Sequence, residues 1–80
     1  AQAHLLIGRI HLRNGRTAQA VDALKISIWS QETTAARVAL AETYMKMRNV
    51  ADARTELERA LVLDPESLEA KRLLSALSGK

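Results

Sequence analysis

The two histidines are the side chains best suited to chemistry in this chain, and their spacing decides whether they can share a metal ion. His4 and His11 are its only imidazoles. On a helix, seven residues put them on one face but about 10 Å apart, because each residue adds roughly 1.5 Å along the axis. A helical metal pair needs the i, i+4 spacing, and the chain has no cysteine to add ligands. We therefore expect no metal or other cofactor, and we interpret both histidines as packing residues.

No other pattern of residues predicts catalysis. A phosphate-binding loop that ends at Thr17 would need glycine at Ile10 and lysine at Arg16. No Gly-x-Ser-x-Gly sequence is present to position a nucleophile. The acidic residues of segment 52–59, Glu56 among them, alternate with arginines at i, i+3 and i+4, which is typical of salt bridges along an exposed helix. We expect that the chain is not an enzyme.

Composition favours one small helical domain. The 80 residues are 48% hydrophobic and 26% charged but only 2% aromatic, with a single proline. Strands usually carry more aromatic and β-branched residues than this. A membrane span needs about 20 apolar residues in succession, and no segment approaches that length. We expect an all-α domain, with no membrane insertion and no signal peptide within these residues.

The charge pattern is mildly basic and uneven. Twelve lysines and arginines against nine acidic residues give a net charge of +3, and Arg9, Arg13 and Arg16 cluster near the N-terminus. Such an excess favours acidic partners. Nucleic-acid binding is the weaker hypothesis, because single-strand binders stack bases on several aromatic side chains and this chain has only Trp29 and Tyr44.

The chain repeats itself at an offset of 33 residues. At this offset small residues correspond to small residues and large residues to large ones. The corresponding pairs are Gly8 and Ala41, His11 and Tyr44, Ala20 and Ala53, Leu24 and Leu57, and Ser27 and Ala60. Within each unit, apolar residues at i, i+3, i+4 and i+7 predict buried helical stripes. The predicted helices cover about 2–13, 17–29, 34–47, 50–63 and 67–77.

Local signals mark the breaks between these helices. Asn14-Gly15 is a turn dipeptide whose glycine accepts a positive φ. Arg48-Asn49 stands at the equivalent place, where we expect Asn49 to take that conformation less readily. Asp64-Pro65 ends the fourth helix, because the residue before proline avoids the α region. Side-chain N-caps are predicted at Thr17, Thr33 and Ser67.

Together these residues resemble the tetratricopeptide repeat. The second unit matches the family pattern almost completely, at Leu40, Ala41, Tyr44, Ala53, Leu57, Ala60 and Pro65. The first unit matches at Ile7, Gly8, Gly15, Ala20 and Leu24 and departs at His4, His11, Ser27 and Glu32. The resemblance implies an α-solenoid of antiparallel helix pairs, with repeat one over 1–33, repeat two over 34–67 and a C-terminal capping helix over 68–80.

The resemblance also implies a function. It points to a non-catalytic protein–protein interaction module, part of a larger scaffold or assembly factor, whose concave groove binds a peptide or helix of a partner. The groove residues it implies are Leu5, Arg9, Leu12, Arg13, Val38, Glu42, Met45, Lys46 and Arg72, with Glu69 on the same lining. Their mixture of apolar and basic side chains suits an acidic and hydrophobic segment.

Self-association is the alternative. Segment 5–12 is apolar nearly all round, and such a helix is normally buried all round. Preceding repeats or a second copy of the chain would have to cover it. The candidate contact residues are Leu6, Ile10, Ile26 and Trp29, the last two at places that the family usually leaves polar. A second interpretation of Trp29 is that the shorter first repeat turns its indole into the gap before the third helix.

Overall fold

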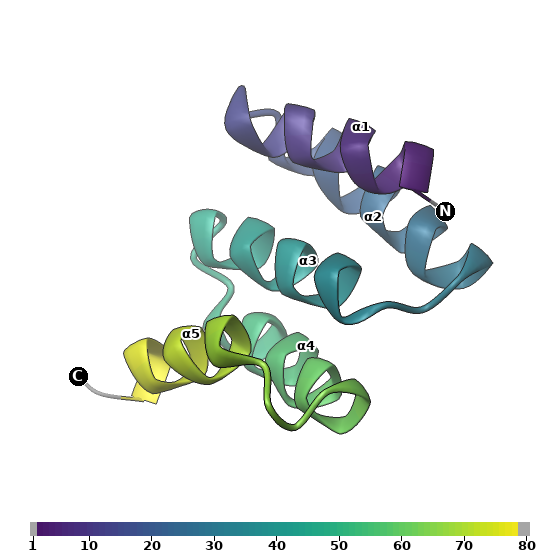
Figure 1. The fold of residues 1–80 in the computed structure, drawn as a ribbon. Coiled ribbons are helices and arrows are strands. Elements are labelled where there is room, and N and C mark those ends of the chain that lie inside the picture. Colours follow the sequence, from purple (N-terminus) through teal and green to yellow (C-terminus); the bar gives the residue numbers. More distant parts are fainter. Residues whose placement is uncertain (1, 79–80) are drawn as a thin grey trace.

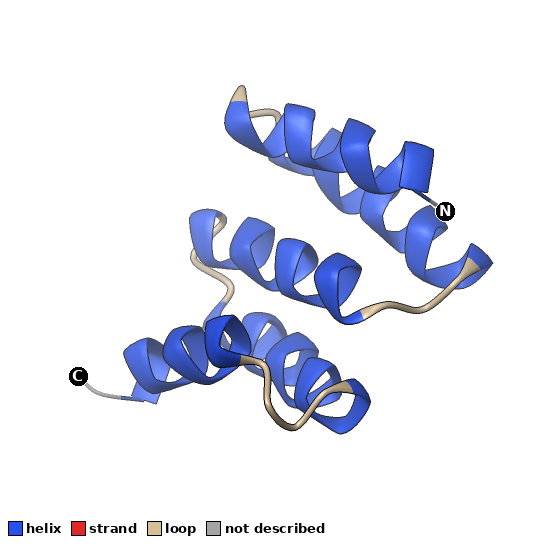
Figure 2. Cartoon of the chain, viewed as in Figure 1, coloured by secondary structure: helices blue, strands red, loops and turns tan. Residues whose placement is uncertain are grey.

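The computed structural model describes residues 2–78, with the side chains of 3–78, as five helices (Figure 1). They are α1 (Gln2–Arg13), α2 (Thr17–Ser30), α3 (Thr34–Lys46), α4 (Val50–Leu63) and α5 (Leu68–Ser78). Figure 2 shows only helices and loops in this part of the chain. The predicted all-α class is confirmed, and each predicted helix end lies within one residue of the observed one. The outer limits predicted for the domain, residues 1 and 80, lie outside the described residues.

The helices form antiparallel pairs in two rows (Figure 1). One row consists of α1, α3 and α5, and the row behind it consists of α2 and α4. Helix α3 packs against α2 as well as its own partner α4, and α5 packs against α4. The longest helices among residues 2–78 have 14 residues, and none is long and apolar enough to cross a membrane. This is the helix-pair solenoid that the sequence predicts.

Small side chains let the helices approach closely, and they fill much of the core. One buried cluster joins α2, α3 and α4 through Leu24, Ala39, Leu40, Tyr44 and Ala53. A second joins α3, α4 and α5 through Val38, Ala41, Leu57, Ala60 and Ala70. The predicted repeat partners Leu24 and Leu57 occupy equivalent buried places in the two units. Each repeat therefore contributes the same stripe of helix positions to the core.

Helices α1 and α2 approach each other closely at Gly8. A Cβ atom placed on Gly8 would lie 2.6 Å from Cγ and Cδ2 of Leu24, which is fully buried. Carbon atoms do not approach this closely without displacement. Glycine at this position therefore sets the distance between the first two helices.

The turns follow the sequence signals with two corrections. Gly15 has a φ of +78°, as expected, but in the second unit Arg48 takes the left-handed conformation, with a φ of +62°. Asn49 instead caps α4, where its Oδ1 accepts from the backbone N–H of Asp52 at 3.3 Å. The predicted caps Thr33 and Ser67 accept backbone N–H groups at 3.1 and 3.2 Å.

Thr17 is not an N-cap. Helix α2 begins at Thr17 itself, and the capping position is Arg16, which makes no side-chain cap hydrogen bond. The Gly15 turn places the start of the helix one residue earlier than a Thr17 cap would require. The start of α2 is thus determined by the turn rather than by a capping side chain.

Candidate functional site

The α1, α3 and α5 row carries a hollow of about 430 Å³, here named the α1–α3–α5 hollow. Helix α1 contributes Arg9, Leu12 and Arg13, while Glu42 comes from α3 and Glu69 from α5. Four of these five belong to the groove set expected from the sequence, and Glu69 belongs to its lining. The fold brings them together because the first helices of successive repeats lie side by side in one row.

Glu42 is a half-buried carboxylate in this hollow, and four nearby charged side chains act on its pKa. Partial burial raises the pKa of its carboxyl group, and the neighbouring charge of Glu69 raises it further. The positive charges of Arg9, Arg72 and Lys46 oppose this shift without cancelling it. Lys46 and Arg72 thus lie near enough to Glu42 to act on it, although they are not part of the hollow's lining.

The apolar part of the expected groove is smaller than the sequence indicates. Val38 is only 3% exposed and packs in the core with Leu57 and Ala70, so it offers no surface to a partner. Leu5 and Met45 are half-buried and pack against the first core cluster. Leu12 is the apolar residue that lines the hollow.

A second hollow, of about 450 Å³, lies on the α2 and α4 side and is named the α2–α4 hollow. Its lining residues are Lys25, Ile28 and Trp29 on α2, Arg37, Leu40 and Tyr44 on α3, and Asp52, Thr55, Glu56 and Arg59 on α4. Sequence reasoning missed this site except for Trp29. The repeat register offered a signal, because it places α2 and α4 on either side of α3.

Trp29 does not fill the junction between the repeats. Its side chain is 90% exposed at the wall of the α2–α4 hollow, so the interpretation that it turns into the gap before α3 is wrong. The connection from α2 to α3 spans 31–33, one residue fewer than the 64–67 connection from α4 to α5. Val62, at the equivalent place before the longer connection, is 81% exposed, so the length of the connection does not account for the exposure of the indole.

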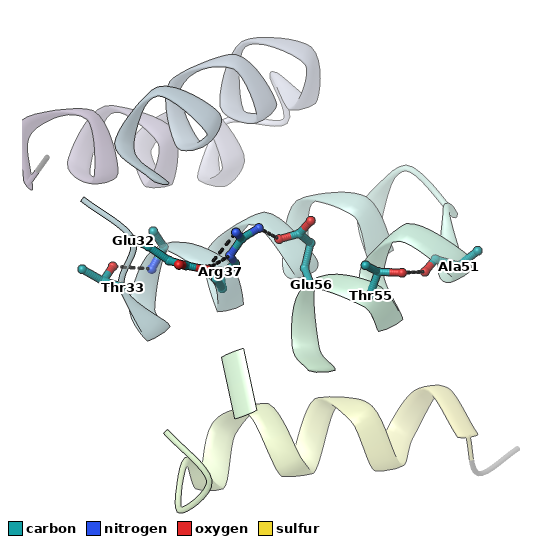
Figure 3. A network of polar contacts seen from close by, with 7 residues as sticks. Glu32, Thr33, Arg37, Ala51, Thr55 and Glu56 are labelled. Carbon is teal, nitrogen blue, oxygen red and sulfur yellow. Dashed lines mark hydrogen bonds and ion pairs between the residues drawn. The ribbon is translucent and has the colours of Figure 1, made fainter. Parts of the chain in front are cut away.

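A chain of polar contacts runs beside this hollow (Figure 3). Nη1 of Arg37 donates to Oε1 of Glu56 at 2.6 Å, and Nε of Arg37 donates to Oε2 of Glu32 at 2.9 Å. Burial opposes the charge of Arg37, but hydrogen bonds to both carboxylates outweigh it, so the pKa of Arg37 is raised. Glu56 is only 8% exposed, which corrects its interpretation as one of the surface acids of α4.

The candidate self-association residues occupy two places. Leu6 and Ile10 on α1 and Ile26 on α2 are 61%, 45% and 44% exposed at the N-terminal end of the solenoid. Trp29, which follows Ile26 by about one helical turn, lines the wall of the α2–α4 hollow, whereas the other three do not. The first three define the N-terminal face, together with Ala3 and Ile7, which are also exposed.

The histidines stand apart from both hollows. Both are half-buried, and Nδ1 of His11 accepts a hydrogen bond from Nε of Arg16 at 3.0 Å. Within residues 2–78, no group of three or more histidine, aspartate or glutamate side chains is close enough to hold a metal ion. His11 connects the end of α1 to the turn that follows it.

Two family models match the chain. Residues 28–77 match one described as tetratricopeptide repeat, and residues 2–30 match a second with the same description. Curated proteins and solved structures gave no match. The two matched ranges together extend over all five helices.

Proposed function

This chain belongs to the tetratricopeptide repeat family, and from that premise we propose that it binds a peptide or helix of a partner protein in the α1–α3–α5 hollow. Domains of this family are generally non-catalytic modules for protein–protein interaction. The bound segment is acidic and hydrophobic. In this proposal the chain itself is non-catalytic and acts within a larger scaffold or assembly factor. The single observation that supports the site is the convergence of Arg9, Leu12 and Arg13 on one hollow.

The charge balance of the hollow supports an acidic segment. Arg9, Arg13, Lys46 and Arg72 carry four positive charges, whereas Glu42 and Glu69 carry two carboxylates. Among residues 3–78, none of these four basic side chains lies within salt-bridge distance of a carboxylate. Carboxylates of a partner can therefore pair with them while an apolar side chain covers Leu12, and such pairing mainly speeds association and fixes register.

The test is a selection of binders from a random linear peptide library, followed by affinity measurements on the selected peptides. We expect acidic and hydrophobic sequences whose affinity falls about tenfold or more in the Arg9→Glu/Arg13→Glu variant, because attraction becomes repulsion. Arg54→Glu/Lys71→Glu is the matched control, since it changes the net charge equally at exposed positions outside the hollow. Equal affinities for the two variants would overturn the proposal.

Self-association through the N-terminal face is a second candidate function, favoured by the repeat register. At the offset of 33 residues, the apolar stripe of α1 corresponds to a stripe of α3 whose residues are all at most 1% exposed. The corresponding pairs are Ala3 and Ala36, Leu6 and Ala39, Ile7 and Leu40, and Ile10 and Thr43. In the second repeat this stripe is covered by the helix pair before it, and on α1 it is open. A second copy of the chain would bury the same apolar stripe.

Solution mass across a range of concentrations tests this second function. We expect a dimer that Leu6→Glu/Ile10→Glu converts to a monomer, because carboxylates would enter the apolar contact. Val62→Glu is the matched control, since Val62 is 81% exposed on α4 and distant in sequence from this face. A monomer at every concentration would remove self-association and leave the peptide-binding proposal unaffected.

A further inference from the structure

The α2–α4 hollow has no role in the function proposed above. It shares no lining residue with the α1–α3–α5 hollow and is similar in size, at about 450 Å³. Volumes in this range are typical of sites that enclose a small ligand or a few side chains. The two sites therefore differ in position and composition, and one can be altered without the other.

Four of the ten residues that line the hollow are apolar or aromatic, and the other six are polar or charged. Ile28 on α2 is half-buried, and Leu40 and Tyr44 on α3 belong to the core cluster that lies beneath. Beside them stands the indole of Trp29, 90% exposed. Aromatic side chains carry large apolar surfaces and concentrate at the energetic centres of interfaces. An occupant that places a large apolar side chain against Trp29 would remove both surfaces from water.

The charges around the hollow indicate what flanks that side chain. Glu56 is neutralised by Arg37, and Asp52 accepts a hydrogen bond from Nδ2 of Asn49 at 2.7 Å. Lys25 on one wall and Arg59 on the other make no salt bridge within residues 3–78. The charges left without an opposite charge in contact are thus two basic ones, Lys25 and Arg59, and one acidic one, Asp52, so the lining carries a net positive charge.

We propose that the α2–α4 hollow is a second peptide-binding site, which takes a segment with one large apolar side chain flanked by carboxylates. The apolar side chain packs on Trp29, Ile28 and Tyr44. The flanking carboxylates pair with Lys25 and Arg59. Two such segments, one on each row of helices, bind the chain at the same time.

Trp29 makes this proposal directly measurable, because it is the only tryptophan in the chain. Peptides selected from a random linear library on the whole chain are titrated while Trp29 emission is recorded. We expect a class rich in aspartate, glutamate and large apolar residues that shifts the emission to shorter wavelength. Its affinity, measured by isothermal titration calorimetry so that the readout does not depend on Trp29, should fall about tenfold or more in Lys25→Glu/Arg59→Glu and in Trp29→Ala.

Two matched variants separate this site from the other. Val62→Ala changes the repeat equivalent of Trp29, which is also exposed, and should leave the affinity unchanged. Arg9→Glu/Arg13→Glu alters only the α1–α3–α5 hollow and should also leave it unchanged. A library that yields no peptide dependent on Trp29 overturns the proposal. An emission shift that follows protein concentration alone would assign the hollow to a second copy and would also overturn it.

Discussion

Nη1 of Arg37 lies 2.6 Å from Oε1 of Glu56, and this contact joins α3 to α4 through side chains that are 13% and 10% exposed. The same guanidinium holds Glu32 in the connection that precedes α3. One arginine therefore fixes both the entry to the second repeat and the packing of its helix pair. The pair also forms part of the α2–α4 hollow, so the hollow's shape depends on it.

Glu56→Ala is expected to lower the free energy of unfolding by about 1–3 kcal/mol, because it leaves the nearly buried Arg37 without its strongest partner. Urea denaturation followed by circular dichroism measures the change. Glu58→Ala, an exposed carboxylate on the same helix, serves as control and should change it by less than about 0.5 kcal/mol. Equal losses in the two variants would mean that the ion pair does not stabilise the fold.

Gly8→Ala is expected to destabilise the chain by about 1–3 kcal/mol, because the new Cβ would overlap Leu24. In an open helix the same change would stabilise by about 0.5–1 kcal/mol, so the sign of the result is decisive. Thermal or urea unfolding provides the measurement. The double variant Gly8→Ala/Leu24→Val should lose less stability than the sum of the losses in the two single variants. A stabilised Gly8→Ala variant would show that α1 does not approach α2 this closely.

The helices and the core were predictable because they depend on local periodicity. Leu24 and Leu57 fall on the same stripe of equivalent helices, so a one-dimensional pattern was enough to place both in the core. Ser67 and Thr33 cap helices through contacts three residues away, which a sequence also displays. Thr17 failed as a cap because the preceding turn, not the side chain, decides where α2 begins.

The sites were less predictable because they depend on contacts between distant residues. Arg37 and Glu56 are 19 residues apart, and nothing local distinguishes Glu56 from the exposed acids beside it. Val38 lies on the row that carries the α1–α3–α5 hollow, yet α4 and α5 cover it. Val62, the repeat equivalent of Trp29, is exposed as well, so the repeat register indicates the exposure of Trp29 but not the α3 and α4 residues that line the hollow with it.

Arg48→Gly is expected to stabilise the chain by about 1 kcal/mol, because a residue with a Cβ is strained at a φ of +62° and glycine is not. Urea denaturation measures the gain. Gly15→Ala, at the equivalent turn, should destabilise the chain by a similar amount, because Gly15 has a φ of +78°. No atom lies near enough for the new Cβ to clash, so the loss would report backbone strain alone. A loss of stability in Arg48→Gly would show that the side chain contributes more than the strain costs.

Glu42 is expected to make the folded chain less stable as the pH rises above the ordinary range of a glutamate. Burial, and then Glu69, raise the pKa of its carboxyl group from 4.5, so the folded state holds the proton more tightly than the unfolded state. As the pH rises through 4.5, the unfolded chain releases this proton first, and ionisation favours unfolding. The stability that the protonated carboxyl group of Glu42 contributes to the folded chain is therefore greatest below pH 4.5 and is lost as the pH passes its raised pKa.

Glu42→Gln isolates this contribution, because it keeps the size of the side chain and removes its titration. The free energy of unfolding of both proteins is measured by urea denaturation from about pH 3.5 to pH 7, a range that spans carboxyl titration. We expect the wild-type chain to lose stability relative to Glu42→Gln across this range. A wild-type chain that instead gains stability relative to Glu42→Gln would mean that Arg9, Lys46 and Arg72 outweigh burial and Glu69.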